Sequence, residues 1–234
     1  MSSPTTEEII KIGTDGVQVL LKNVREDKNS DDKPWVKNLE KIVDSCPLVV
    51  YESEVPNSPL YRFKCVIDVP YDPDLIQERM HDNIARRKWD TNIHELDIVE
   101  IQASNPRVFI LRSATKAVGP ISARDFIDVT AVMKDSNGKL VSGGGSLIDL
   151  QRFPVQSGFV RGWNSSGGGW YYEPRINPNG KLIGCRIHYV IHTDLKGWLP
   201  TMIVNNAIAG SYVTFYTDFL KHLKEAYPQA IIKE

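Results

Sequence analysis

The sequence of 234 residues has no surplus of charge of either sign. It contains 28 Lys and Arg residues against 29 Asp and Glu residues, which gives a formal net charge of −1. A protein that holds a nucleic-acid backbone or an anionic membrane through its overall field needs a basic excess. We therefore expect no nucleic-acid partner, and any contact with a membrane has to be local. The hydrophobic share of 41% is enough to bury a sizeable core, which argues against intrinsic disorder.

Cysteines and long apolar runs are also scarce. The three cysteines, Cys46, Cys65 and Cys185, are an odd number at wide spacing. This pattern argues against a disulfide framework or a zinc ribbon and suits a reducing compartment. No run approaches the roughly 18 apolar residues of a spanning helix, and residues 1–6 lack the features of a secretory leader. These absences predict a soluble, cytoplasmic protein.

Residues suited to metal or covalent chemistry are few and scattered. The five histidines are His81, His94, His188, His192 and His222. Only the pair at 188 and 192 is close, and four residues of strand span about 13 Å at ~3.3 Å per residue, which is too far for one ion. The glycine runs at 143–145 and 167–169 lie between strands and lack the Lys-Ser/Thr of a phosphate loop. We expect close backbone packing at one and a turn at the other, with no metal, no cofactor and no catalytic residue.

The first part of the chain predicts helices. Thr5 and Glu8 form a capping box, and apolar residues then recur at helical spacing up to Val24. The charged residues 25–34 predict a loop, followed by a short second helix over Val36–Val43. Because this loop shows no folded boundary, residues 1–34 are expected to belong to a single domain that covers residues 1–234.

The middle of the chain predicts a meander of antiparallel strands. Residues 48–51 and 61–67 form a hairpin, and Asp72 with Pro73 starts a helix that runs to about residue 87. The further strands are expected at residues 97–103, 107–114, 125–133, 140–147, 158–163, 170–172 and 182–193. Short turns join them, and no helix separates successive strands, so a parallel βαβ arrangement is excluded.

A long amphipathic helix is predicted after Pro200. Its apolar positions are Val204, Ile208, Tyr212, Phe215, Phe219 and Leu223, and it extends to residue 226, about 40 Å at 1.5 Å per residue. A curved antiparallel sheet closed by one long helix is an α+β architecture whose interior can be hollow, because the two surfaces diverge.

Three motifs in register carry a family resemblance. They are Arg87-Lys88-Trp89-Asp90, then Val118-Gly119-Pro120 with Ala123-Arg124-Asp125-Phe126, and finally the run from His192 to Pro200 (HTDLKGWLP). In order and spacing they resemble the StAR-related lipid-transfer (START) domain family, over roughly residues 36–223. The resemblance implies a helix-grip fold, in which a curved antiparallel sheet wraps around a long C-terminal helix and encloses a lipid tunnel.

The resemblance also implies a function. Members carry or sense a sterol, phospholipid or ceramide without changing it chemically. Exposing the apolar surface of a lipid to water costs about 25 cal/mol per Å², and a closed apolar tunnel avoids most of this cost. We expect a monomer that holds one lipid molecule and touches membrane surfaces transiently. The door of the tunnel is then residues 115–123, with Val118, Gly119, Pro120 and Ile121 as a lid loop.

Strand alternation and the resemblance together predict the lipid contacts. Phe109, Leu111 and Ser113 share one strand face, and Phe126, Asp128 and Thr130 share one face of the next strand. The predicted tunnel floor is Val204, Ile208, Tyr212 and Phe215 on the long helix, with Asn205 as a hydrogen-bonding group and His188 as a further polar contact. Ser113 and Thr130 stand where steroidogenic members carry an acid and an arginine, so their mode of sterol recognition does not carry over.

Several roles stay open in the sequence. Asp128 either meets a cationic head group or bonds Arg112, Arg186 or a water. Asp128 with His188 is also the one candidate pair for the alternative of an enzyme of this superfamily, such as a cyclase or hydrolase, and a lipid-sensing interaction module is a third interpretation. Three residues of the family motifs are expected to be structural: Trp89 as a packing anchor, Arg124 as an ion-pair or carbonyl partner, and Trp198 as a plug at the helix entry.

Overall fold

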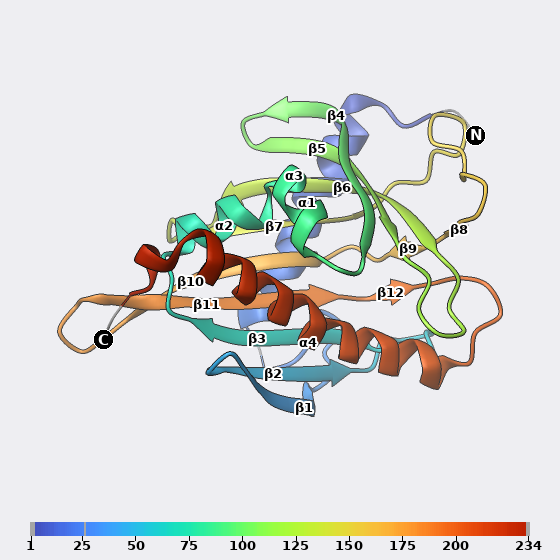
Figure 1. Ribbon diagram of the computed structural model, residues 1–234. Helices are drawn as coiled ribbons and strands as arrows, with labels where there is room; N and C mark the ends of the chain where they lie inside the picture. The colour runs from blue at the N-terminus through green and yellow to red at the C-terminus, as the bar shows by residue number, and fades with distance from the viewer. Residues whose placement is uncertain (1–2, 26, 233–234) are drawn as a thin grey trace.

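The computed structural model describes residues 3–25 and 27–232, and its main feature is one large antiparallel sheet (Figure 1). The strands are β1 (Val36–Val43), β2 (Cys46–Ser53), β3 (Arg62–Val69), β4 (Ile93–Ser104), β5 (Arg107–Thr115), β6 (Arg124–Lys134), β7 (Leu140–Ser146), β8 (Val160–Arg161), β9 (Trp163–Asn164), β10 (Gly168–Ile176), β11 (Leu182–Ile191) and β12 (Thr193–Asp194). The helices are α1 (Thr6–Arg25), α2 (Pro73–Met80), α3 (Asn83–Trp89), α4 (Thr201–Ala226) and the 3₁₀ turn η1 (Pro228–Ala230).

The order of strands across the sheet is β1-β2-β3-β11-β10-β7-β6-β5-β4, with every neighbouring pair antiparallel. The short strand β8 pairs with β6 in parallel, and β9 pairs with β12 in a separate ribbon. The sheet does not close on itself, so β1 and β4 are its edges. This arrangement confirms the predicted α+β class, the antiparallel meander and the helix-grip fold.

One predicted helix is wrong. Val36–Val43 forms the edge strand β1, which pairs with β2 in a hairpin from Val36 opposite Glu52 to Val43 opposite Cys46. Its apolar positions follow a helical spacing, but Asp44 and Ser45 adopt positive φ angles of 51° and 65°. Two consecutive residues in that region form the tight turn typical of a two-residue hairpin, and that turn returns the chain along β1.

The predicted helix after Asp72 is two helices. Asp72 caps α2 as expected, because its carboxylate accepts a hydrogen bond of 2.8 Å from the Asp74 backbone N–H. Asp82 then caps α3 by accepting from the Ala85 backbone N–H at 3.0 Å. This second capping residue marks the break between the two helices.

Helices cover the two faces of the sheet (Figure 1). On one face α1 buries Ile9, Val17 and Leu20 against β5, β6 and β7. On the other face α4 packs across β1, β2 and β3, with Tyr212, Tyr216 and Phe219 fully buried. As predicted, Trp89 is a packing anchor in this second core, and its ring lies 5.1 Å from that of Phe219.

Glycines allow α1 to approach the sheet closely. A Cβ atom added to Gly16 would lie 2.5 Å from the Gly144 Cα atom, closer than any real contact. The run at 143–145 therefore has the predicted role of close backbone packing, and Gly167 (φ 89°) lies in the predicted turn.

We expect Gly16→Ala to lower the free energy of unfolding by about 1–3 kcal/mol, because the added methyl group forces α1 away from β7. Gly210→Ala on α4 is the matched control, since nothing lies within 4 Å of its added Cβ atom. There the higher helix propensity of alanine should raise stability by up to about 1 kcal/mol. Urea unfolding followed by circular dichroism measures both, and equal effects of the two changes would contradict the packing argument.

Candidate functional site

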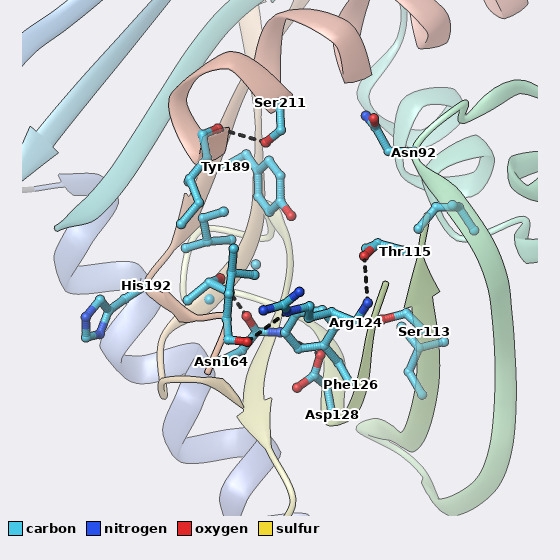
Figure 2. Close-up of a pocket in the computed structure, with 18 of the residues that line it drawn as sticks. Asn92, Ser113, Thr115, Arg124, Phe126, Asp128, Asn164, Tyr189, His192 and Ser211 are labelled. Carbon is cyan, nitrogen blue, oxygen red and sulfur yellow. Dashed lines mark hydrogen bonds between the residues drawn. The ribbon is translucent and has the colours of Figure 1, made fainter. Parts of the chain in front are cut away.

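A cavity of about 560 Å³ lies between the concave side of the sheet and α4 (Figure 2). The strands contribute Leu111, Ser113, Phe126, Asp128 and Thr130, and α4 contributes Asn206, Ala207, Ile208, Gly210, Ser211 and Thr214. Its volume falls in the range of about 300–1,000 Å³ that is typical of small-molecule sites.

The structure brings half of the predicted lipid contacts to this cavity. Leu111, Ser113, Phe126, Asp128, Thr130 and Ile208 line it, whereas Phe109, His188, Val204, Asn205, Tyr212 and Phe215 do not. On the two strands, Phe109 is the predicted residue that does not line the cavity; it is buried elsewhere, with the Arg107 guanidinium 5.1 Å from its ring.

The predicted floor on α4 is the part that differs most. The Tyr212 ring packs 5.2 Å from that of Tyr189, the Phe215 ring packs 5.5 Å from that of Trp89, and Val204 is buried in the same core. Asn205 accepts a hydrogen bond from the Tyr61 backbone N–H at 3.3 Å instead of facing a ligand.

A neighbouring stripe of α4 faces the cavity instead. It consists of small residues at helical spacing, namely Ala207, Gly210, Ser211 and Thr214. Small side chains leave the space between α4 and the sheet unfilled. On the neighbouring face of α4, the large side chains of Val204, Tyr212 and Phe215 fill the space between the helix and the sheet. The recurrence of small residues at steps of three and four was the sequence signal for this face.

His188 lies on the opposite face of the sheet from Asp128. Side chains alternate along β11, so His188 shares the face of Val190, which belongs to the core under α1. Its Nε2 atom lies 3.6 Å from a carboxylate oxygen of Glu173. The candidate catalytic pair of Asp128 and His188 is therefore wrong, because the sheet separates the two side chains.

Asp128 is part of a polar network in the cavity wall. Ser146 Oγ donates to Asp128 Oδ1 at 2.6 Å, and Asn164 Nδ2 donates to Oδ2 at 2.8 Å. The two arginines expected as partners lie elsewhere: Arg112 pairs with Glu95 at 3.3 Å and Arg186 with Asp68 at 2.7 Å. Burial raises the pKa of Asp128, opposed by hydrogen bonds from Ser146 and Asn164 and by the charge of Arg161.

This raised pKa predicts a pH effect on stability. A carboxyl group whose folded-state pKa exceeds its unfolded value binds its proton more tightly in the folded state. Its contribution to stability therefore grows as pH falls through the raised folded-state pKa towards about 4, the unfolded value. We expect the wild type to gain stability relative to Asp128→Asn over that fall in pH. Urea unfolding of both proteins across this range tests it, and a constant difference would contradict it.

Two loops flank one end of the cavity. In the first, Val118 and Ile121 exchange backbone hydrogen bonds of 2.8 and 3.0 Å, and both side chains line the cavity. Gly119 (φ 56°) and Pro120 form the exposed tip between them and do not line the cavity. The second loop joins β12 to α4 and contributes Leu195.

Arg124 ties these loops together. Its side chain is buried at 3% exposure, and it donates to the Leu195 carbonyl at 2.9 Å, to the Lys196 carbonyl at 3.1 Å and to Ser122 Oγ at 2.8 Å. It also donates to the Ser122 carbonyl. The predicted role as a carbonyl partner is confirmed, and the contacts make Arg124 a clamp between the loops at the mouth.

Trp198 is not a plug. It is completely exposed, and Met202 on the first turn of α4 and Val118 in the facing loop are 70% and 58% exposed. Lys196 (φ 53°) and Gly197 (φ 78°) both adopt left-handed backbone conformations just before Trp198. This turn carries the indole ring away from the core, so three apolar side chains stand in water at the mouth loops.

Neither a spanning helix nor a metal cluster occurs in residues 3–25 and 27–232. No helix there is long and apolar enough to cross a membrane. No three side chains of His, Cys, Asp or Glu come together there as a metal site requires.

Comparisons with known proteins converge on one family. A family model described as START domain matches residues 18–228. Human StAR-related lipid transfer protein 4 is 32% identical over 175 residues, which cover 73% of this chain and 78% of the relative. Human StAR-related lipid transfer protein 5 is 31% identical over 142 residues, which cover 60% of this chain and 63% of the relative.

Solved structures show the same fold. The structure of human StAR-related lipid transfer protein 5 matches with a TM-score of 0.80 at 21% identity, covering 94% of this chain and 99% of that one. A STAR-related lipid transfer protein from Xanthomonas axonopodis matches with a TM-score of 0.65 at 19% identity, covering 81% and 98%.

Proposed function

This chain belongs to the START domain family, and we propose that it binds one lipid molecule in the cavity under α4 and transfers it between membranes without chemical change. The observation that carries the proposal is the cavity itself, which lies between the sheet and a helix stripe of small residues. The proposed lipid contacts are the predicted residues that line this cavity, namely Leu111, Ser113, Phe126, Asp128, Thr130 and Ile208.

The size of the cavity favours one kind of lipid among those considered. At the roughly 30 Å³ that a water molecule occupies in the liquid, 560 Å³ has room for on the order of 20 water-sized groups. A phospholipid with two full acyl chains has about twice as many non-hydrogen atoms as a sterol. The space therefore suits a sterol better than such a phospholipid. We therefore propose a sterol-sized cargo.

Exchange of the lipid is proposed to occur through the mouth loops. Trp198, Met202 and Val118 are exposed apolar side chains beside the loops that line the cavity. Lys116 lies two residues before Val118, and Lys196 two residues before Trp198. Tryptophan with nearby lysine is the combination that favours a membrane interface. The lid role of Val118, Gly119, Pro120 and Ile121 is part of this proposal.

The proposed location is the cytoplasm, with the protein acting as a monomer. Cys46, Cys65 and Cys185 are buried free thiols, which suits a reducing compartment. Burial raises the pKa of Cys46 to about 11, so this thiol stays protonated and unreactive.

Native mass spectrometry after incubation with cholesterol, phosphatidylcholine or ceramide tests the proposal. We expect one bound lipid per chain, with cholesterol retained best. Gly210→Phe, which places a large ring in the cavity, should abolish retention, whereas Met202→Phe at an exposed position of α4 should leave it unchanged. Failure of the folded wild type to retain any of the three lipids would contradict the proposed function.

A further inference from the structure

Three hydrogen-bond donors form a row along the cavity wall near α3. The Arg86 guanidinium carbon lies 5.5 Å from the centre of the Trp170 ring, and Trp170 stacks on Tyr189 with centroids 4.3 Å apart. All three residues line the cavity. Figure 2 shows the Tyr189 hydroxyl directed into the open centre of the cavity.

These donors have unused hydrogen-bonding capacity. The indole Nε1 of Trp170 is buried and has no partner in the described part of the chain. Arg86 uses its Nε to donate to Asp90 at 3.0 Å, while neither of its terminal nitrogens bonds any described residue. The Tyr189 hydroxyl likewise has no hydrogen bond to residues 3–25 or 27–232. Of these donors, Trp170 Nε1 is buried without a partner among the described residues, which is unfavourable, while Arg86 and Tyr189 line the cavity beside it. Together they favour an acceptor that is supplied by the ligand.

The protein's own acceptors nearby are already engaged. Asp90 accepts from Arg86 through Oδ2 and from the Asn92 backbone N–H through Oδ1 at 3.2 Å. Both carboxylate oxygens of Asp128 accept from Ser146 and Asn164. The Arg86 side chain is also held in place, with 11% exposure and its guanidinium carbon 5.0 Å from the Phe215 ring. The donor row is therefore preorganised for an oxygen that comes from elsewhere.

We propose that the wall formed by Arg86, Trp170 and Tyr189 binds an acceptor oxygen of the cargo, a ketone or carboxylate oxygen at one end of a rigid apolar body. This assignment rests on the proposed lipid-binding function and deepens it, because it names the polar group that the cavity selects. It also replaces the cationic head group considered for Asp128, since a donor row repels a cation that brings no acceptor.

Three steroid probes of similar shape test the assignment. They are 5α-cholestan-3-one, which carries a ketone, 5α-cholanic acid, which carries a carboxylate, and 5α-cholestane, which carries no oxygen. Their affinities are measured by displacement of a fluorescent sterol. We expect the wild type to bind the ketone or the acid at least about tenfold more tightly than the hydrocarbon. The tighter of the two oxygen probes identifies which acceptor fits.

Trp170→Phe with Tyr189→Phe removes two donors and keeps the stacked rings. We expect the preference for oxygen to fall below about threefold in this double variant, with unchanged affinity for 5α-cholestane as evidence that the cavity is intact. Trp35→Phe with Tyr51→Phe makes the same two changes around Lys64, away from the cavity, and is the matched control that should keep the full preference. If the wild type binds all three probes equally, the assignment is wrong and the proposed function stands; if it binds none of them, both are wrong.

Discussion

Replacing Arg124 with methionine is expected to lower the free energy of unfolding by about 2–4 kcal/mol. The methionine side chain keeps much of the volume but donates no hydrogen bonds, so the carbonyls of Leu195 and Lys196 lose a buried partner. Arg87→Met is the matched control, because Arg87 forms an exposed pair with Asp97 at 3.0 Å and such pairs contribute about 0–1 kcal/mol. Urea unfolding monitored by tryptophan fluorescence measures both variants.

The same substitution tests whether the clamp keeps the mouth closed. With the two loops no longer joined, we expect bound lipid to leave Arg124→Met at least about five times faster than wild type, because local opening then requires fewer contacts to break. Stopped-flow release of a fluorescent sterol measures the rate. Unchanged release from a destabilised variant would show that Arg124 supports the fold without controlling access to the cavity.

Trp198→Ala is expected to slow lipid transfer between vesicles by about tenfold. The completely exposed indole loses no contact within the protein when it is removed, so stability and equilibrium binding should stay unchanged. Transfer should fall because the ring would no longer anchor the mouth at the membrane interface, and each 1.4 kcal/mol of lost attraction is worth about a factor of ten. Transfer of a fluorescent sterol between donor and acceptor vesicles provides the rate.

Ile101→Ala is the control for this variant. Ile101 is 62% exposed on the edge strand β4, apart from the loops at the mouth. Its removal should leave the transfer rate within about twofold of wild type. Equal slowing by both variants would indicate a general surface effect, and normal transfer by Trp198→Ala would contradict the proposed membrane contact.

The sequence predicted α4 well but not the direction of its faces. The spacing of Val204, Tyr212 and Phe215 defines an apolar stripe, and any apolar stripe fits either a sheet or a ligand. Which of the two it meets depends on how β1, β2 and β3 are placed, and local pattern carries no information about that. The strand residues Leu111 and Phe126 were easier, because alternation leaves only two faces to choose between.

The errors at Val36–Val43 and Trp198 have different physical origins. The apolar residues of Val36–Val43 follow a helical spacing, and pairing with β2 overrides that local pattern. Trp198 was judged by residue type, since large aromatic side chains are usually buried. The left-handed turn at Lys196 and Gly197 overrides that tendency, and only Gly197 signals such a turn in the sequence.

Because the sheet is open, its edge strands β1 and β4 could each pair with a strand of a second molecule. Edge strands with a regular register and free backbone groups invite a strand from a second chain, which is how fibrils begin. On β1 the alternating charges of Lys37, Glu40 and Lys41 oppose such addition. On β4 the pairing with β5 shifts register at three places, which distorts the outer edge. Both edges of the open sheet are therefore poor templates for the addition of a further strand.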